Sequence, residues 1–214
     1  MIIPYIAKSA VDAAEISELF DSAAIPFHPI AVVNWPKEFP YTPGVKFRIA
    51  HNGSMILIEY VVAEEYVRAM AESDNGHVWE DSCVEMFITF DGSHYYNIEC
   101  NCRGKVLLAC GPERNDRTYS TPEQVALIRR SPSIADAKPF DSSPAQGEWS
   151  MRLAIPAEAF FADRITDLRG IHAKANFYKC GDRLPTPHFL SWQPIPVASP
   201  DFHLPQFFGD VIFE

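Results

Sequence analysis

The chain has 214 residues, of which 47% are hydrophobic and 21% charged, which is ordinary for a folded protein. Its net charge of −10 excludes a nucleic-acid-binding role, because phosphate recognition needs clustered Lys and Arg and the sequence has no such cluster. No run approaches the roughly 18 apolar residues of a membrane span. We therefore expect neither nucleic acid nor membrane among its partners.

The residue pattern favours strands over helices. Helical character is confined to short stretches at 10–21, after a Ser9–Asp12 segment that has the form of a capping box, and at 63–70 and 156–161. Strands are predicted between loops rich in Pro, Gly and Asn: at 29–34, 45–50, 55–62, 82–90, 94–102, 105–110, 125–130, 148–155, 172–180, 188–193 and 210–213.

Many short strands with few helices predict an all-β fold. We expect an antiparallel, jelly-roll-like β-sandwich with one to three short peripheral helices. The chain has no repeat and no low-complexity linker, so residues 1–214 are expected to form a single domain. Residues 1–28 would be an N-terminal extension of that domain.

The cysteines indicate a reducing environment. Their number is odd, and most lie in predicted strands, which favours buried free thiols over disulfides or metal ligands. The first residues also lack the basic and long apolar regions of a signal peptide. We expect a cytoplasmic protein, or a secreted one if a signal has been removed. The cysteines are Cys83, Cys100, Cys102, Cys110 and Cys180.

The segment 77–90, "HVWEDSCVEMFITF", carries the first candidate site. Apolar residues at alternate positions from Val84 to Phe90 indicate a strand with one face in the core. Glu85 lies on the other face, between Cys83 and Phe87. A carboxylate in that semi-apolar setting, just after Trp79, needs an explanation.

The next strand, 94–102, has a polar face of its own. Asn97, Glu99 and Arg103 lie on it, although Asn is a poor strand residue. If the two strands are neighbours, Glu85, Asn97 and Arg103 converge near Trp79. Sugar C–H faces stack on indole, and sugar hydroxyls pair with planar polar groups, so this set would suit a sugar.

Six segments, in the same order from about residue 30 to the C-terminus, resemble carbohydrate-binding module family 9-like domains, relatives of the DOMON sandwich group. They are "VWEDSCVEMFITF", "YYNIECNCRG", "EWSMRLAIP", "KANFYKCGD", "HFLSWQPI" and "PDFHLPQFFGDVIFE". The resemblance implies a β-sandwich that grips one or two sugar rings, such as the reducing ends of xylan- or glucan-type glycans, between two tryptophans. It implies a non-catalytic role accessory to glycan degradation, alongside a glycoside hydrolase.

The resemblance also assigns residues. Trp79 and Glu85 keep the family spacing of a Trp six residues before a Glu, and Trp192 is the match for the second tryptophan. The family's polar ligands map to Arg103, Asn97 and Asn176. Family members hold structural calcium, but no run of alternating oxygen ligands occurs here, so no calcium ligand is assigned and no cofactor is expected.

Alternatives stay open. Glu85 and Glu99 could instead be the two carboxylates of a glycoside hydrolase, with Asp81 nearby. A haem-binding DOMON-like module would need Met86 or a histidine as an axial ligand. Glu85 could also be a buried acid without a ligand role, whose charge and hydrogen bonds are satisfied by pairing with Arg103. Trp35 and Trp149 are predicted to be core or loop-packing residues. Three histidines are predicted to be loop or packing residues and not metal ligands, and they are His172, His188 and His203.

Overall fold

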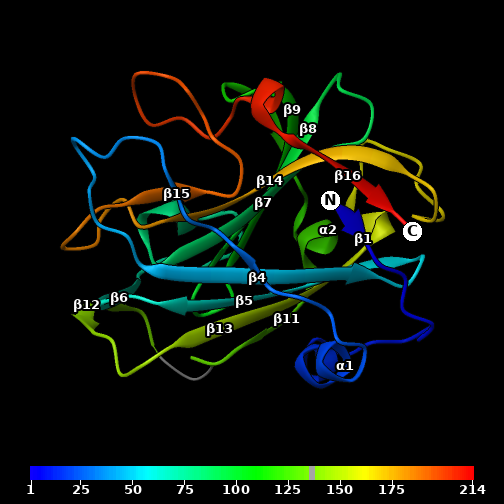
Figure 1. Ribbon diagram of the computed structural model, residues 1–214, viewed down its shortest axis with the longest axis horizontal. Coiled ribbons are helices and arrows are strands. Elements are labelled where there is room, and N and C mark those ends of the chain that lie inside the picture. The colour runs from blue at the N-terminus through cyan, green and yellow to red at the C-terminus, as the bar shows by residue number, and fades with distance from the viewer. Residues whose placement is uncertain (135–137) are drawn as a thin grey trace.

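The computed structural model describes residues 1–134 and 138–214, and it consists mainly of two stacked β-sheets (Figure 1). Most paired strands in this part of the chain run antiparallel, while the short strands β1 and β16 at the termini pair in parallel. The prediction of an all-β antiparallel sandwich is confirmed. Within the described residues, no helix is both long and apolar enough to cross a membrane.

The first sheet has nine strands, in the order β1-β16-β14-β7-β8-β9-β10, with β15 pairing with β14 and β3 with β15. Its central strands β14, β7 and β8 are the predicted strands at 172–180, 82–90 and 94–102. The bounds are β1 (Ile2–Ile3), β3 (Val32–Val33), β7 (Cys83–Thr89), β8 (Tyr95–Asn101), β9 (Val106–Glu113), β10 (Asp116–Tyr119), β14 (His172–Cys180), β15 (Phe189–Ser191) and β16 (Gly209–Phe213).

The second sheet has five strands in the order β11-β13-β5-β4-β2, and a two-stranded ribbon of β12 and β6 lies beside it. The bounds are β2 (His28–Pro29), β4 (Gly44–His51), β5 (Met55–Ala63), β6 (Tyr66–Ala69), β11 (Arg129–Pro132), β12 (Phe140–Pro144) and β13 (Trp149–Pro156).

Of the three stretches with predicted helical character, one forms an α-helix. Helix α1 (Ile16–Ser22) follows a 3-10 turn (Ala13–Glu15), so a helix forms within 10–21 as expected. The capping box expected at Ser9–Asp12 is wrong, because Asp12 is itself the cap and accepts from the backbone N–H of Ala14. The helix predicted at 63–70 is wrong, because β6 pairs there with β12. At 156–161 there is only a 3-10 turn (Ala157–Ala159).

The strand predicted at 125–130 is wrong in its first half. Helix α2 (Pro122–Ala126) occupies that half, because Thr121 and Gln124 form a capping box at its start. The strand β11 begins only at Arg129.

The main core lies between the two sheets and confirms the alternation read from the sequence. Val84, Met86 and Ile88 of β7 all face this core and are almost fully buried. Phe47 of β4 stacks on Phe177 of β14 across the sandwich, with ring centroids 4.0 Å apart. Burial of large apolar side chains is the dominant stabilising contribution here.

The outer face of the first sheet is also covered. Loop residues from 35–39 and 195–208 pack over it and form a second apolar cluster with Phe87, Tyr95 and Tyr178. Every residue of β7 and β8 is therefore buried, including the polar ones. Polar groups on this face lie in a medium of low dielectric, where their charges interact strongly.

A fully buried ion pair links the two sheets. Lys179 of β14 lies 2.9 Å from Glu64, which follows β5, and neither side chain is exposed. The other Glu64 oxygen accepts a hydrogen bond from the indole N–H of Trp149 at 2.7 Å. Lys179 also contacts Nε2 of His188. Burial and the lysine charge lower the pKa of His188 to about 2, so the imidazole stays neutral and its Nε2 accepts a hydrogen bond from the ammonium.

We predict that Glu64→Gln destabilises the protein by about 3–5 kcal/mol, because it leaves the Lys179 ammonium buried without a counter-charge. Urea unfolding at neutral pH measures this. Asp210→Asn is the control, since the Lys174–Asp210 pair at 3.7 Å is solvent-exposed and should contribute less than about 1 kcal/mol. Equal effects of the two substitutions would contradict the role given to the buried pair.

Candidate functional site

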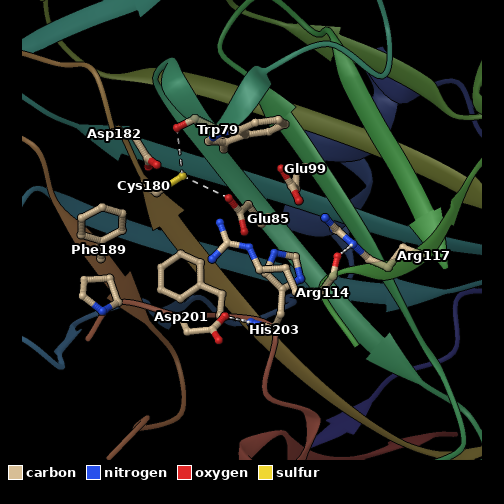
Figure 2. A pocket seen from close by; sticks show the side chains of 12 residues that line it. Trp79, Glu85, Glu99, Arg114, Arg117, Cys180, Asp182, Phe189, Asp201 and His203 are labelled. Atoms are coloured by element: carbon tan, nitrogen blue, oxygen red, sulfur yellow. Dashed lines mark hydrogen bonds between the residues drawn. The ribbon is translucent and has the colours of Figure 1, made fainter. Parts of the chain in front are cut away.

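A pocket opens on the outer face of the first sheet, at the end of β14 and beside β7 and β8 (Figure 2). Its volume is about 170 Å³. It combines aromatic walls with many ionisable groups, and its residues come from segments distant in sequence. They are Trp79, Glu85, Glu99, Arg114, Arg117, Cys180, Asp182, Phe189, Pro200, Asp201, Phe202 and His203.

Two carboxyl groups lie side by side at the floor. Glu85 of β7 and Glu99 of β8 are direct cross-strand partners, which places their Cβ atoms about 4.5–5.5 Å apart. They are 2% and 4% exposed, so solvent reaches them only through the pocket. Asn97 donates a hydrogen bond to Glu99 at 2.9 Å, and the Cys180 thiol donates one to Glu85 at 3.0 Å.

Burial keeps these carboxyl groups protonated at pH values above those at which a glutamate ordinarily ionises. Burial first, and the neighbouring Glu99 second, raise the pKa of Glu85 well above its ordinary value. Burial raises the pKa of Glu99 to about 7, although the Asn97 hydrogen bond and the charge of Arg117 act in the opposite direction. Because the two groups interact, they titrate as a pair, and at neutral pH the floor holds at least one proton that can be donated.

Trp79 forms one wall, and a buried carboxylate fixes its position. It lies on a 3-10 turn (Val78–Glu80), half-buried, with His77 stacked on its ring at 4.6 Å. Asp81, which directly follows the turn, is fully buried and accepts hydrogen bonds from Arg68, Asn101 and two backbone N–H groups. Asp81 is therefore an anchor for the turn, and not a third acid in the pocket.

Two arginines of the β9–β10 hairpin, Arg114 in the turn and Arg117 on β10, complete the opposite side of the pocket. Arg117 donates from Nε to the carbonyl of Arg114 at 2.8 Å, but its Nη1 is buried and has no hydrogen-bond partner among the described residues. The hairpin needs glycine at position 111 of β9, because a Cβ there would collide with the backbone of Asp116 on β10. An unpaired buried donor in a pocket is a place for an acceptor oxygen of a ligand.

The structure brings together two of the six predicted site residues, Trp79 and Glu85. Asn97 is adjacent but fully buried beneath the pocket, where its amide orients Glu99. Asn176 is used within the fold, since its side chain bonds the backbone of Phe177 and Gln193.

Arg103 and Trp192 lie away from the pocket. Strand β8 ends at Asn101 and Gly104 turns the chain with φ +86°, so Arg103 reaches the carbonyl of Ala69 and does not pair with Glu85. Trp192 packs at the edge of the core between the sheets, against Phe47 and Phe177. The expected pair of facing tryptophans is therefore not formed.

Phe189 occupies the second wall in place of Trp192. It lies on β15 beside the pocket and is half-buried (Figure 2). Residues three apart on a strand point to opposite faces. Along the predicted strand 188–193, in "HFLSWQPI", Phe189 and Trp192 therefore point to opposite faces. The alternation of faces along that segment was therefore a sequence signal that separated Phe189 from Trp192. No such signal marked Arg114 and Arg117, because only the fold brings the β9–β10 hairpin to the pocket.

His203 was expected to be a loop or packing residue, and it also lines the pocket. Its Nδ1 lies 2.9 Å from the hydroxyl of Tyr95, and its ring packs on Phe87. Burial, together with the charges of Arg117 and Arg114, lowers its pKa to about 3, so the ring is neutral at ordinary pH. His203 can exchange hydrogen bonds with a ligand without adding charge.

One group of described residues could meet around a metal ion, and it consists of Cys83, Glu85 and Cys180. It is rich in sulfur, so it does not fit calcium, which prefers oxygen ligands. All five thiols are free and buried, as predicted. Met86, the residue weighed as a haem ligand, is 1% exposed in the core between the sheets.

Comparisons with known proteins agree with this architecture. The sequence model of carbohydrate-binding family 9 matches residues 14–213. A crystal structure of a Bacteroides uniformis ATCC 8492 protein, assigned provisionally to carbohydrate binding, is 44% identical with a TM-score of 0.96, over 100% of this chain and 98% of that chain. No curated protein sequence matches the chain.

More distant structures share the fold alone. Two structures of a family 9 carbohydrate binding module from Caldicellulosiruptor kristjanssonii, in complex with glucose and with cellotriose, have TM-scores of 0.52 and 0.54 at 11% identity. They align with 100% of this chain and with 95% and 93% of their own lengths. The fold and these matches define a β-sandwich of the carbohydrate-binding module class. The chain belongs to carbohydrate-binding family 9, which confirms the resemblance and supports a non-catalytic role in sugar binding.

We predict that stability falls as pH rises from about 4.5 to 7. In this window the folded state binds a proton at Glu99 that the unfolded chain releases, so the stabilisation present below the unfolded pKa is lost as pH rises through the folded one. Glu99→Gln should flatten this slope by up to about 1.4 kcal/mol per pH unit. Urea unfolding at several pH values measures it, with Glu113→Gln at an exposed position of β9 as control. Identical slopes in wild type and Glu99→Gln would contradict the buried, protonated acid.

Proposed function

We propose that the pocket binds one terminal ring of a glucan- or xylan-type saccharide and does not cleave it. The observation that carries this is the pair of opposed carboxyls, Glu85 and Glu99, at the floor of a small pocket walled by aromatic rings. A volume of about 170 Å³ lies below the range of roughly 300–1,000 Å³ that suits drug-sized ligands, so it fits a single ring.

The aromatic walls suit the apolar faces of a sugar. Trp79 and Phe189 stand on different sides of the Glu85 floor, both half-buried (Figure 2). An aromatic contact adds roughly 0.5–1.5 kcal/mol beyond area burial. Phe189 here takes the part that the resemblance gave to a second tryptophan.

The polar groups suit hydroxyls, because they offer both donors and acceptors. A protonated carboxyl donates while its neighbour accepts, and the unpaired Nη1 of Arg117 supplies a further donor. Hydrogen bonds that involve a charged group are worth about 1.5–3 kcal/mol each. Association itself costs several kcal/mol, so we expect net affinity weaker than the ~8.2 kcal/mol of a micromolar complex.

The distant structures support this choice of ligand, since that module was crystallised with glucose and with cellotriose. A reducing-end preference, a glycoside hydrolase partner and an accessory role in glycan degradation belong to the same proposal. They rest on the family resemblance, and the pocket itself does not distinguish xylan from glucan.

We predict that Trp79→Ala lowers the affinity for glucose and cello-oligosaccharides at least about tenfold, because it removes one stacking wall. Isothermal calorimetry measures the affinity, and the melting temperature verifies folding. Trp192→Phe is the matched control, since Trp192 packs in the core and should leave affinity unchanged. If Trp192→Phe abolishes binding and Trp79→Ala does not, the pocket is the wrong site.

A glycoside hydrolase is the second candidate, because Glu85 and Glu99 do face each other on adjacent strands. A retaining enzyme needs one ionised and one protonated carboxyl about 5–5.5 Å apart. Here burial raises the pKa of both groups. Asp182 also lines the pocket, and burial raises its pKa to about 6, so each of these three acids is disfavoured as an ionised nucleophile.

We therefore predict no release of reducing sugar from xylo- or cello-oligosaccharides by the protein alone between pH 5 and 8. A reducing-end assay over long incubation, with Glu85→Gln as the matched control, decides between the two candidates. Hydrolysis that Glu85→Gln abolishes would replace the binding proposal with an enzymatic one.

A further inference from the structure

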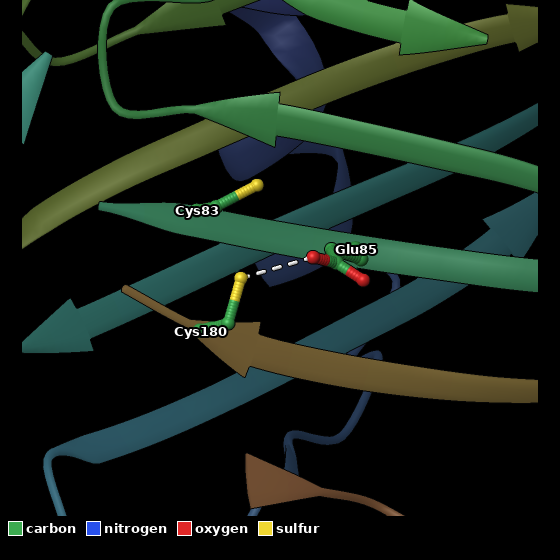
Figure 3. Close-up of side chains that lie close together, drawn as sticks. All are labelled: Cys83, Glu85 and Cys180. Atoms are coloured by element: carbon green, nitrogen blue, oxygen red, sulfur yellow. Dashed lines mark hydrogen bonds between the residues drawn. The ribbon is translucent and has the colours of Figure 1, made fainter. Parts of the chain in front are cut away.

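Two thiols and a carboxyl meet beside the pocket floor, and sugar binding does not account for them. Cys83 and Glu85 lie two residues apart on β7 and share its outer face, and Cys180 ends the neighbouring strand β14 (Figure 3). Cys83 and Cys180 are direct cross-strand partners. The three side chains are therefore held by the register of two central strands and not by flexible loops.

The ligand atoms have the spacing of a metal site. The two Sγ atoms and a Glu85 oxygen all lie within 4.8 Å of one another, and Cys180 Sγ is 3.0 Å from Glu85 Oε1. Zinc bonds to sulfur and oxygen are about 2.0–2.3 Å long, so tetrahedral ligand atoms stand about 3.3–3.8 Å apart. Small side-chain rotations would bring the present groups to that geometry.

We propose that Cys83, Cys180 and Glu85 form a binding site for a thiolate-preferring divalent cation, with Zn²⁺ as the ion that fits best. Two thiolates and one carboxylate make three ligands, and zinc sites with three protein ligands keep a fourth position for water or another molecule. Glu85 and Cys180 both line the pocket, so the fourth position would open into it. Magnesium and calcium are disfavoured by the sulfur ligands.

The charges and protons involved in zinc binding are all accounted for. Zn²⁺ forms two Zn–S bonds and one Zn–O bond, and the two thiols and the carboxyl release their protons to solvent. The resulting cluster carries one negative charge, which the nearby Lys179 ammonium partly offsets. Because burial raises the pKa of Cys83 to about 12, metal must compete with protons, and affinity should increase steeply with pH.

This site is separable from the proposed sugar site. Cys83 is fully buried and does not line the pocket, so its substitution should remove the metal and leave the sugar contacts in place. Cys100 offers a matched control, because it is an equally buried thiol on the core face of β8.

The test uses the fully reduced protein and the metal alone. We expect one equivalent of Co²⁺ to give a thiolate-to-cobalt charge-transfer band, which Zn²⁺ displaces, and one equivalent of Zn²⁺ to raise the melting temperature. Cys83→Ser and Cys180→Ser should weaken metal binding at least about 100-fold, measured against a chromophoric chelator, while Cys100→Ser behaves as wild type.

Three outcomes would overturn the proposal: no charge-transfer band in the reduced wild-type protein, a band that survives in Cys83→Ser, or equal loss in Cys100→Ser. If the serine variants fail to fold, Glu85→Gln and the zinc-dependent melting temperature of the wild type decide instead. Sugar calorimetry on Cys83→Ser keeps the two proposals distinct, because it should bind sugar as the wild type does even when it has lost the metal.

Discussion

The register of β7 between β8 and β14, in a sheet covered on both faces, is the constraint on which the site depends. It sets Glu85 opposite Glu99 on one side and Cys83 opposite Cys180 on the other. Each residue of these strands has little freedom, since a one-residue slip would turn Val84, Met86 and Ile88 out of the core. The hydrophobic core thus fixes polar groups that could not hold these positions by their own interactions.

Burial on both faces gives these groups their chemistry. On a solvated outer face, two opposed glutamates would ionise and repel, and the thiols would have ordinary acidity. Under the cover of the loop residues in 195–208, the carboxyls keep protons to a higher pH and the thiols stay protonated until a cation displaces the protons. The same loops supply Asp201 and His203 to the pocket, so one element both dehydrates the floor and builds its wall.

A family 9 sandwich can therefore keep its fold while the groups around its pocket change. The chain retains Trp79 six residues before Glu85, but the second aromatic wall is Phe189, and cations come from the β9–β10 hairpin. Asn97 and Asn176, expected to meet a ligand, instead orient Glu99 and hold the backbone after β15. Buried amides commonly serve such structural hydrogen bonds.

The sequence by itself determined the fold class and the two faces of β7 and β8, because these follow from local period-2 patterns. The pairing of Trp79 with Glu85 came instead from the family spacing of a Trp six residues before a Glu. It also showed that Trp149 would be a core residue, since it alternates with other apolar residues. Only the tertiary structure decided that Arg103 turns away after Gly104, that 63–70 forms an edge strand, and that Arg117 and His203 reach the pocket. Those outcomes depend on contacts between segments far apart in the chain, and local residue patterns carry no information about which distant segments will meet.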